Sequence, residues 1–185
     1  MQLLFLVTND LTYDQRMIRI CRTLAQAGYA VRLVGRALPN SNTLVEETFA
    51  QHRLFCFFKK GKFFYLEFNI RLFFYLLWHR FDLVCAIDLD TILPAYIVSK
   101  LRHKKMVYDA HEYFTEVPEV VHRPFTKRIW EMVAQWTIPN IKHCYTVGPS
   151  LAKILSERYG VDFEVIRNVA EVAPTSPSPS KGGEY

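Results

Sequence analysis

Apolar and polar residues follow two patterns that alternate along the chain. Residues 3–8 form a short, continuous apolar run that stops at polar residues, which is typical of a strand covered on both faces of a sheet. Residues 14–28 instead place apolar side chains at helical spacing and end at Gly28, a common helix terminus. This order of strand, loop, helix and glycine predicts the start of a βαβ unit.

The rest of the chain repeats this order. Further apolar runs predict strands at residues 29–36, 53–59, 82–88, 105–111, 143–148 and 163–168. Segments with helical character predict helices at residues 63–81, 91–101, 123–139 and 149–160. The alternation predicts a single doubly wound α/β domain over residues 1–172, with a mostly parallel Rossmann-like sheet and helices on both faces.

The composition changes sharply near the end of the chain. Residues 173–185 are rich in proline, serine and glycine and contain few apolar side chains, so they predict a disordered linker. Because a linker joins two units, we expect a further segment to follow Tyr185.

Charge and cysteine content narrow the choice of partner and compartment. The net charge of +5 and the isoelectric point near 9.0 favour an anionic partner, such as a nucleotide or a phospholipid surface. The four cysteines lie far apart and form no C-x-x-C pair, so they predict buried, reduced thiols. No basic leader precedes the first strand. We therefore expect a cytoplasmic protein.

Polar residues follow the predicted strands, at the edge where a doubly wound sheet binds its ligands. They are Asn9, Asp10, Arg36, Asp88, Asp90, Asp109, His111, Glu112, Ser150 and Asn168. Asp109 and His111 lie two positions apart, so they share one side of an extended strand. A histidine beside a carboxylate can exchange a proton near neutral pH or donate to a sugar hydroxyl or a phosphate. Equally, Asp109 could cap a turn and His111 could bond to it for structure alone.

Asp14 and Arg16 flank the start of the first predicted helix. A helix N-terminus attracts anions, and Arg16 could help to bind a phosphate or a carboxylate. The alternative is that Asp14 complements the helix dipole while Arg16 is solvated. The first strand is followed by neither a G-x-G-x-x-G motif nor a P-loop lysine, which argues against dinucleotide binding and ATP hydrolysis.

The segment at residues 59–81 has an unusual density of aromatic side chains. As a helix it carries one polar stripe, made of Glu67, Arg71, Tyr75 and His79. The charges within it argue against a transmembrane span.

Two interpretations of this segment remain open. It is either a buried crossover helix, or a helix that presents Phe, Leu and Trp side chains to a bilayer interface beside Lys59, Lys60 and Lys62. No RNA-recognition or helix-turn-helix signature accompanies these residues, so we expect no nucleic acid partner.

Five stretches, taken in order, resemble the N-terminal half of GT-B glycosyltransferases of the family 4 type. They are "TNDLTYDQRMIRICRTLAQAGYAVRLVGR", "DLVCAIDLDTILPA", "KMVYDAHEYFTE", "YTVGPSLAKIL" and "FEVIRNV". The resemblance runs from Met1 to about Val172, which is nearly the whole chain.

The resemblance implies an enzyme in which two Rossmann-like domains face each other across a cleft. The N-terminal domain mainly holds the acceptor, and the C-terminal domain holds the nucleotide sugar. The resemblance also implies that the anomeric configuration is retained, that no metal is needed, and that the nucleotide-sugar donor takes the place of a cofactor. Many members glycosylate lipid-linked acceptors, which implies a membrane surface as a partner and a peripheral location at its inner face.

Roles for individual residues also follow from the resemblance. His111 would reach toward the donor sugar, Glu112 would orient that sugar, and Asp88 would sit close to the acceptor. The residues implied to line the cleft besides these three are Asn9, Asp10, Asp14, Arg16, Asp109, Ser150 and Asn168. In this group the loop at residues 9–16 would approach the donor phosphates or the acceptor, and Asn168 would lie at the hinge.

The chain departs from the pattern of many relatives at two places. Thr8, Asn9 and Asp10 stand where those relatives have a glycine-rich turn, and Ile87 precedes Asp88 where they have histidine. The domain whose paired glutamates bind the nucleotide sugar is missing from these 185 residues.

We therefore expect the acceptor-binding domain of a retaining glycosyltransferase. It would transfer a hexose from a nucleotide sugar to a glycan or lipid-linked acceptor, in cell-envelope polysaccharide biosynthesis, and it would be inactive without the donor domain. The alternative is a standalone Rossmann-like module that binds a nucleotide or a partner, docks on membranes and catalyses nothing.

Overall fold

The computed structural model describes residues 1–169 and contains one seven-stranded sheet. In chain order the strands are β1 (Gln2–Leu6), β2 (Ala30–Arg36), β3 (Ala50–Leu54), β4 (Leu83–Ile87), β5 (Lys105–Ala110), β6 (His143–Thr146) and β7 (Phe163–Val165). Across the sheet their order is β3-β2-β1-β4-β5-β6-β7, and every neighbouring pair is parallel. The predicted linker at residues 173–185 lies outside the described residues.

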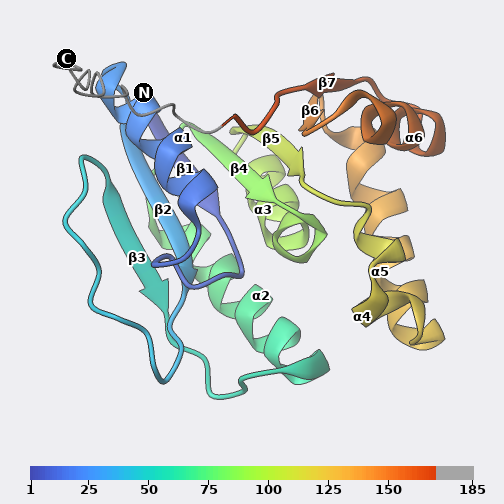
Figure 1. The fold of residues 1–185 in the computed structure, drawn as a ribbon, viewed down its shortest axis with the longest axis horizontal. Helices are drawn as coiled ribbons and strands as arrows, with labels where there is room; N and C mark the ends of the chain where they lie inside the picture. Colours follow the sequence, from blue (N-terminus) through green and yellow to red (C-terminus); the bar gives the residue numbers. More distant parts are fainter. Residues whose placement is uncertain (170–185) are drawn as a thin grey trace, which may run out of the picture.

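A helix follows each of β1, β3, β4, β5 and β6, whereas a loop joins β2 to β3 (Figure 1). The helices are α1 (Gln15–Gln26), α2 (Gly61–Trp78), α3 (Leu89–Leu101), α4 (Pro118–Val121), α5 (Pro124–Thr137) and α6 (Pro149–Tyr159), with short 3₁₀ turns at η1 (Phe114–Glu116) and η2 (Ile138–Asn140). The prediction of a doubly wound α/β domain is thereby confirmed.

The side chains of β1 point alternately to the two faces of the sheet and enter two separate cores. Leu3 and Phe5 pack with Met17 of α1, whereas Leu4 and Leu6 pack into the core that contains residues of α2, α3, α5 and α6. Figure 1 shows α1 across β1 and β2, and α3 on the other side of β4. Helices thus cover both faces, as predicted.

The third strand lies earlier than the sequence pattern predicts. The prediction was residues 53–59, whereas β3 spans Ala50–Leu54. The backbone N–H groups of Phe57 and Phe58 donate to the carboxylate of Glu67, each at 2.9 Å, instead of to a neighbouring strand. A helix side chain therefore fixes the phenylalanine-rich residues 55–58 as a loop.

Helix α2 has a buried face and an exposed face, and both are apolar. The buried residues are Phe64, Phe68, Leu72, Tyr75 and Leu76. The exposed ones are Phe63, Leu66, Ile70, Phe74 and Trp78. The inner face is that of a buried crossover helix, while contact of the outer face with a bilayer stays a prediction. Within residues 1–169, no helix has the length and apolar character needed to cross a membrane.

The cysteine prediction is confirmed. Cys21, Cys56, Cys85 and Cys144 are all buried, and none of them forms a disulfide.

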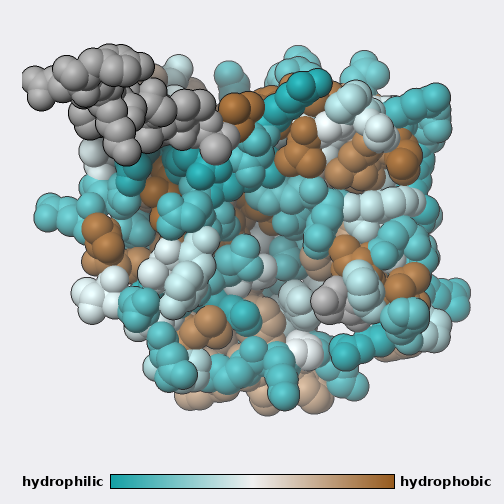
Figure 2. Space-filling view, viewed as in Figure 1, coloured by the Kyte–Doolittle hydropathy of each residue, from teal (hydrophilic) through white to brown (hydrophobic). Residues whose placement is uncertain are grey.

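Figure 2 shows one face of the molecule, on which separate hydrophobic patches lie among mostly hydrophilic residues.

Candidate functional site

An acidic pocket lies at the carboxyl ends of the central strands β1, β4 and β5. It has a volume of about 440 Å³. Its lining residues are Val7, Thr8, Asn9, Tyr65, Ile87, Asp88, Asp90, His111, Glu112, Phe114, Val117 and Val120. The three residues expected to be catalytic, Asp88, His111 and Glu112, therefore meet in one pocket.

Asp88 and His111 are held against each other by the ends of β4 and β5. The backbone N–H of His111 donates to Asp88 Oδ1 at 2.8 Å, and His111 Nδ1 lies 3.8 Å from Asp88 Oδ2. The backbone N–H of Asp88 in turn donates to the carbonyl of Asp109 at 2.9 Å. These hydrogen bonds hold a carboxylate and an imidazole side by side in the pocket.

Asp109 lies behind His111 and not in the pocket. Its side chain is fully buried, and its Oδ2 lies 2.9 Å from His111 Nε2. Arg16 donates to both of its carboxylate oxygens at 3.1 Å. Asp109 therefore orients His111 and Arg16, which differs from the expected contact of Asp109 with a ligand in the cleft. Arg16 itself is not the solvated side chain of the alternative interpretation, since its side chain is 12% exposed.

Burial and neighbouring charges together raise three pKa values in the pocket. Burial raises the pKa of Asp88 to about 6, although the charge of His111 opposes the shift. Burial, and next the charge of Asp88, raise the pKa of Asp90 to about 7. Burial disfavours the imidazolium of His111, but the hydrogen bond with Asp109 and the charge of Asp88 outweigh it and raise the pKa of His111. These groups can therefore exchange protons near neutral pH.

Asp90 also lines this pocket; the strand-end pattern placed it at the ligand-binding edge, but it was given no role in the cleft. Thr8 Oγ1 donates to Asp90 Oδ2 at 2.6 Å, while Asp90 Oδ1 is buried without a hydrogen-bond partner. Because Asp90 lies in the first turn of a helix, its charge is readily explained as one that complements the helix dipole. The available signal was the pair of aspartates around a single leucine, directly after a buried strand.

Glu112 is the exposed member of the pocket. Among the described residues it has no hydrogen-bond partner and no salt bridge, so its carboxylate is available to a ligand.

The loop between β1 and α1 forms a second, polar cavity of about 510 Å³. Asn9, Asp10, Asp14 and Arg16 all line it, as does Asn168. Asp14 caps α1 by accepting from the backbone N–H of Met17 at 3.1 Å. The structure thus brings together the loop residues that the sequence placed near donor phosphates or acceptor.

Asp10 is engaged by the protein itself. Its carboxylate accepts hydrogen bonds from Ser41 and Thr12 and from Arg53 at 2.6 Å. Burial alone would raise its pKa, but these hydrogen bonds lower the pKa of Asp10 to about 2. Its carboxylate therefore shapes the β1–α1 loop and is not free for a ligand.

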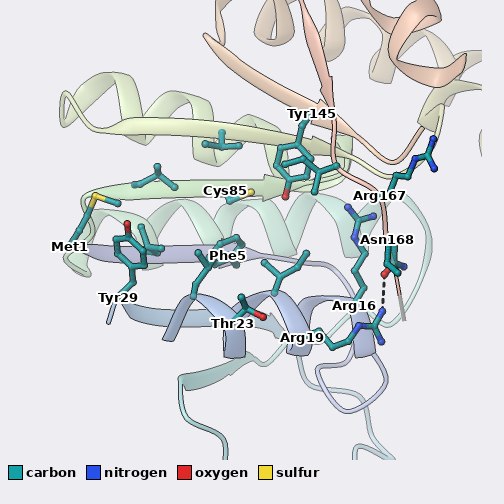
Figure 3. A pocket seen from close by; sticks show the side chains of 17 residues that line it. Met1, Phe5, Arg16, Arg19, Thr23, Tyr29, Cys85, Tyr145, Arg167 and Asn168 are labelled. Carbon is teal, nitrogen blue, oxygen red and sulfur yellow. Dashed lines mark hydrogen bonds between the residues drawn. The ribbon is translucent and has the colours of Figure 1, made fainter. Parts of the chain in front are cut away.

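A third, largely apolar cavity of about 720 Å³ lies on the sheet face beside α1. Figure 3 shows Cys85 and Tyr145 on the strands and Arg16 and Arg19 at the end where Arg19 hydrogen-bonds to Asn168. The Arg19 Nη2 to Asn168 Oδ1 distance is 2.7 Å. Asn168 therefore follows β7 at the rim of two cavities, while its hinge role stays a prediction.

The remaining predicted residues lie elsewhere. Ser150 is exposed in the first turn of α6 and lines none of the cavities described above. Lys59, Lys60 and Lys62 are exposed around the start of α2. Among the side chains that the structure describes, no three His, Cys, Asp or Glu residues converge as a metal site would require.

Comparison with solved structures gives half-chain matches. HepE from Anabaena in complex with UDP and glucose is 17% identical, with a TM-score of 0.62 over 94% of this chain and 47% of that chain. Sucrose-phosphate synthase from Thermosynechococcus elongatus is 13% identical, with a TM-score of 0.61 over 90% of this chain and 47% of that one. The chain thus spans about half the length of these proteins.

The same fold occurs outside the glycosyltransferases. UDP-GlcNAc 2-epimerase from Methanocaldococcus jannaschii is 12% identical, with a TM-score of 0.50 over 90% of this chain and 45% of that chain. None of the curated proteins compared with this sequence matches it. The structural matches therefore show the fold alone.

The family follows from the sequence. The model of Glycosyltransferase Family 4 matches residues 15–172, a range that contains the acidic pocket residues Asp88, Asp90, His111 and Glu112. The chain therefore belongs to Glycosyltransferase Family 4.

Proposed function

We propose that these residues form the acceptor-side half of a retaining glycosyltransferase. The enzyme transfers a sugar from a nucleotide sugar to a glycan or lipid-linked acceptor, and this half is inactive alone. The observation that carries the proposal is the acidic pocket, where Asp88, His111 and Glu112 meet at the carboxyl edge of the sheet. Family membership and the half-length structural matches support it.

The geometry suggests a division of work within the pocket. Glu112 is exposed and accepts a hydrogen bond from a sugar hydroxyl. His111, held from behind by Asp109 and beside Asp88, donates to the sugar or to the acceptor. Asp88, with its pKa raised to about 6, takes a proton from an acceptor hydroxyl at neutral pH. Both walls of a cleft are needed to position donor and acceptor, so one wall alone does not catalyse transfer.

A chimera tests the proposal. Residues 1–172 are joined to the C-terminal half of HepE, and sugar transfer is measured with a panel of nucleotide sugars and acceptors. We expect transfer by the chimera, no sustained transfer by the 185-residue chain, and a loss of about 100-fold or more in H111Q. The matched control is H143Q, which changes an exposed histidine at the start of β6.

Two results would contradict the proposal. Sustained transfer by the 185-residue chain alone would refute the claim that it is half of a catalytic unit. Tight nucleotide binding by this chain, together with an inactive but folded chimera, would favour the standalone binding module.

We also infer that the protein is cytoplasmic and binds the inner face of a membrane peripherally, as suits cell-envelope polysaccharide biosynthesis. The support is the outer face of α2, which exposes Phe63, Leu66 and Trp78 beside the basic residues at its start. Lys62 Nζ lies 5.3 Å from the ring centroid of Phe63, so cationic and aromatic groups are interleaved there. Such a surface suits an anionic bilayer interface.

A further inference from the structure

A small basic cavity adjoins the acidic pocket. Its volume is about 220 Å³. It is lined by Thr8, Asn9, Arg36, Lys59, Lys60, Gly61, Phe64 and Tyr65. Three of these side chains are cationic and none is a carboxylate, so the lining of the cavity carries a net positive charge.

Arg36 is the innermost cation of this cavity. It ends β2, and its guanidinium lies 4.5 Å from the ring centroid of Phe64. Its Nη1 donates to the carbonyl of Lys59 at 3.4 Å, while its Nε is buried without a hydrogen-bond partner. Among the described residues, no carboxylate forms a salt bridge with Arg36. The guanidinium is thus positioned by packing and is left with donors to spare.

The first turn of α2 adds to the same charge. Lys60 is its N-cap, makes no side-chain capping bond, and is followed by no acidic residue in the first turn. The nearest acid along the helix, Glu67, is already engaged by two backbone N–H groups and by Arg71 at 2.7 Å. No acidic side chain of α2 therefore neutralises the basic cavity.

The two pockets share a wall. Thr8, Asn9 and Tyr65 line both the basic cavity and the acidic pocket. A single ligand can therefore place a sugar against Asp88 and His111 and an anionic group against Arg36. The basic cavity is smaller than the roughly 300–1,000 Å³ that is usual for drug-sized ligands, so it suits a compact anion.

We propose that the basic cavity binds a phosphate or diphosphate group carried by the acceptor. The inference rests on the proposed function, because it needs the acceptor sugar in the acidic pocket. Arg36 offers the planar donor set that matches phosphate oxygens, and Lys59 and Lys60 add charge from the loop. The acceptor class is thereby narrowed to phosphate-bearing molecules, either lipid-linked or soluble.

Binding of inorganic pyrophosphate to the 185-residue chain tests the proposal. Calorimetry at about 0.15 M salt limits non-specific attraction between charges. We expect saturable binding that weakens about tenfold or more in R36Q and measurably in K60Q. K60Q changes an exposed residue, so it keeps the test valid if R36Q does not fold.

The matched control is K105Q, which removes the same charge from an exposed residue at the opposite end of the sheet. Absence of saturable binding, or an equal loss in K105Q, would overturn the proposal. Because this measurement needs no transfer, an inactive chimera with intact pyrophosphate binding would refute the proposed function and leave the anion site standing.

Two further ligands distinguish the source of the phosphate. Farnesyl diphosphate represents a lipid-linked acceptor, and glucose 1-phosphate represents a soluble one. If farnesyl diphosphate binds more tightly than pyrophosphate, and R36Q abolishes the binding of both, the cavity is assigned to lipid-linked acceptors. Tighter binding of glucose 1-phosphate, with the same sensitivity to R36Q, assigns it to soluble ones. Binding of either ligand that is insensitive to R36Q and K60Q counts against the cavity.

Discussion

Asp88 adopts a backbone conformation that aspartate rarely adopts. Its φ is 57° and its ψ is 172°. Strained non-glycine conformations of this kind cost about 1–3 kcal/mol and persist only where the surrounding structure enforces them. The enforcing contacts are the hydrogen bonds that link Asp88 to the backbone of Asp109 and His111. The strain thus lies at the candidate site, where it fixes the carboxylate toward His111.

Asp90 should make the protein less stable as the pH rises. Its pKa is about 7 in the folded protein and near 3.8 without burial, so its favourable contribution is complete below pH 3.8 and is lost as the pH rises through 7. We expect D90N to raise the free energy of unfolding at pH 8 by about 2–4 kcal/mol, with the gain vanishing near pH 4. Urea unfolding across this pH range measures it.

The asparagine of D90N keeps an oxygen acceptor for Thr8, so the packing is preserved. D162N, at an exposed residue, is the control and should follow the wild-type pH profile. A D90N gain that is independent of pH would contradict the assigned cause.

The pair of Arg16 and Asp109 should dominate the stability of the site. Loss of Arg16 removes the guanidinium that pairs with the fully buried Asp109, so we expect R16M to reduce the free energy of unfolding by about 3 kcal/mol. R22M breaks a more exposed pair, because the Arg22 side chain is 41% exposed, and it should cost about 1 kcal/mol or less. Equal losses in urea unfolding of the two variants would show that burial of the pair contributes little.

At the scale of residues, sequence reasoning reached the contacts that strand geometry sets and not those that depend on the path of a loop. The side-by-side placement of Asp109 and His111 followed from strand geometry, and the meeting of Asp88 with His111 followed from the strand-end rule. The contact between Arg16 and Asp109 depends on the path of the β1–α1 loop, which no local pattern specifies. The engagement of Asp10 by Arg53 was missed for the same reason.

At the scale of elements, a side chain of α2 supplies a hydrogen bond that the backbone of α3 lacks. Pro94 lies within α3 and has no N–H to donate to the carbonyl of Asp90, four residues earlier. Asn69 Nδ2 of α2 donates to that carbonyl at 3.0 Å. The polar Asn69 thus has a structural cause, and it joins two helices beside the acidic pocket.

A double-mutant cycle tests this compensation. We expect N69L to lower the free energy of unfolding by about 1–3 kcal/mol, because it leaves the Asp90 carbonyl without this donor. In the P94A background the helix supplies its own N–H, so N69L should cost measurably less there. Urea unfolding of the four proteins gives the coupling energy, and a coupling of zero would exclude the compensation.

The sequence pattern located most elements but shifted some of their ends. Apolar runs predicted the strands because burial sets the run length, as in β4 and β5. The run at residues 53–59 misled, since its aromatic side chains are exposed in a loop and its N–H groups bond to Glu67. Long-range capping of this kind leaves no local signal.

At the scale of the whole molecule, one surface departs from the usual polar exterior. The outer face of α2 combines exposed Leu66 and Trp78 with the exposed, basic β3–α2 loop. We expect binding to vesicles that contain anionic phospholipid. The affinity should fall about tenfold or more in L66S/W78S, because each substitution removes an apolar contact with the bilayer. Co-sedimentation measures the bound fraction.

The control is I154S, which removes an exposed apolar side chain from α6 near the opposite edge of the sheet. Equal binding by L66S/W78S and I154S would mean that α2 is not the contact surface. K62Q should weaken binding less, and this loss should shrink at high salt.

The topology was the most predictable feature of the molecule. Right-handed crossovers and short connections leave few ways to arrange alternating strands and helices, and the observed parallel order is one of them. The shapes of the four cavities were not predictable, because they depend on loops whose side chains meet across the sheet. Arg36 illustrates this, since it marked a strand end in the sequence and became the centre of a basic cavity only in the fold.

The strand order also determines when the pocket can form during synthesis. β1 pairs with β2 on one edge, but its other edge must wait for β4, and Arg16 must wait for a partner 93 positions later. At about 5–20 residues per second, the growing chain therefore presents an open edge of β1 for several seconds. Ribosome-bound chains that end before residue 87 therefore lack a complete β4 and should depend most on chaperones.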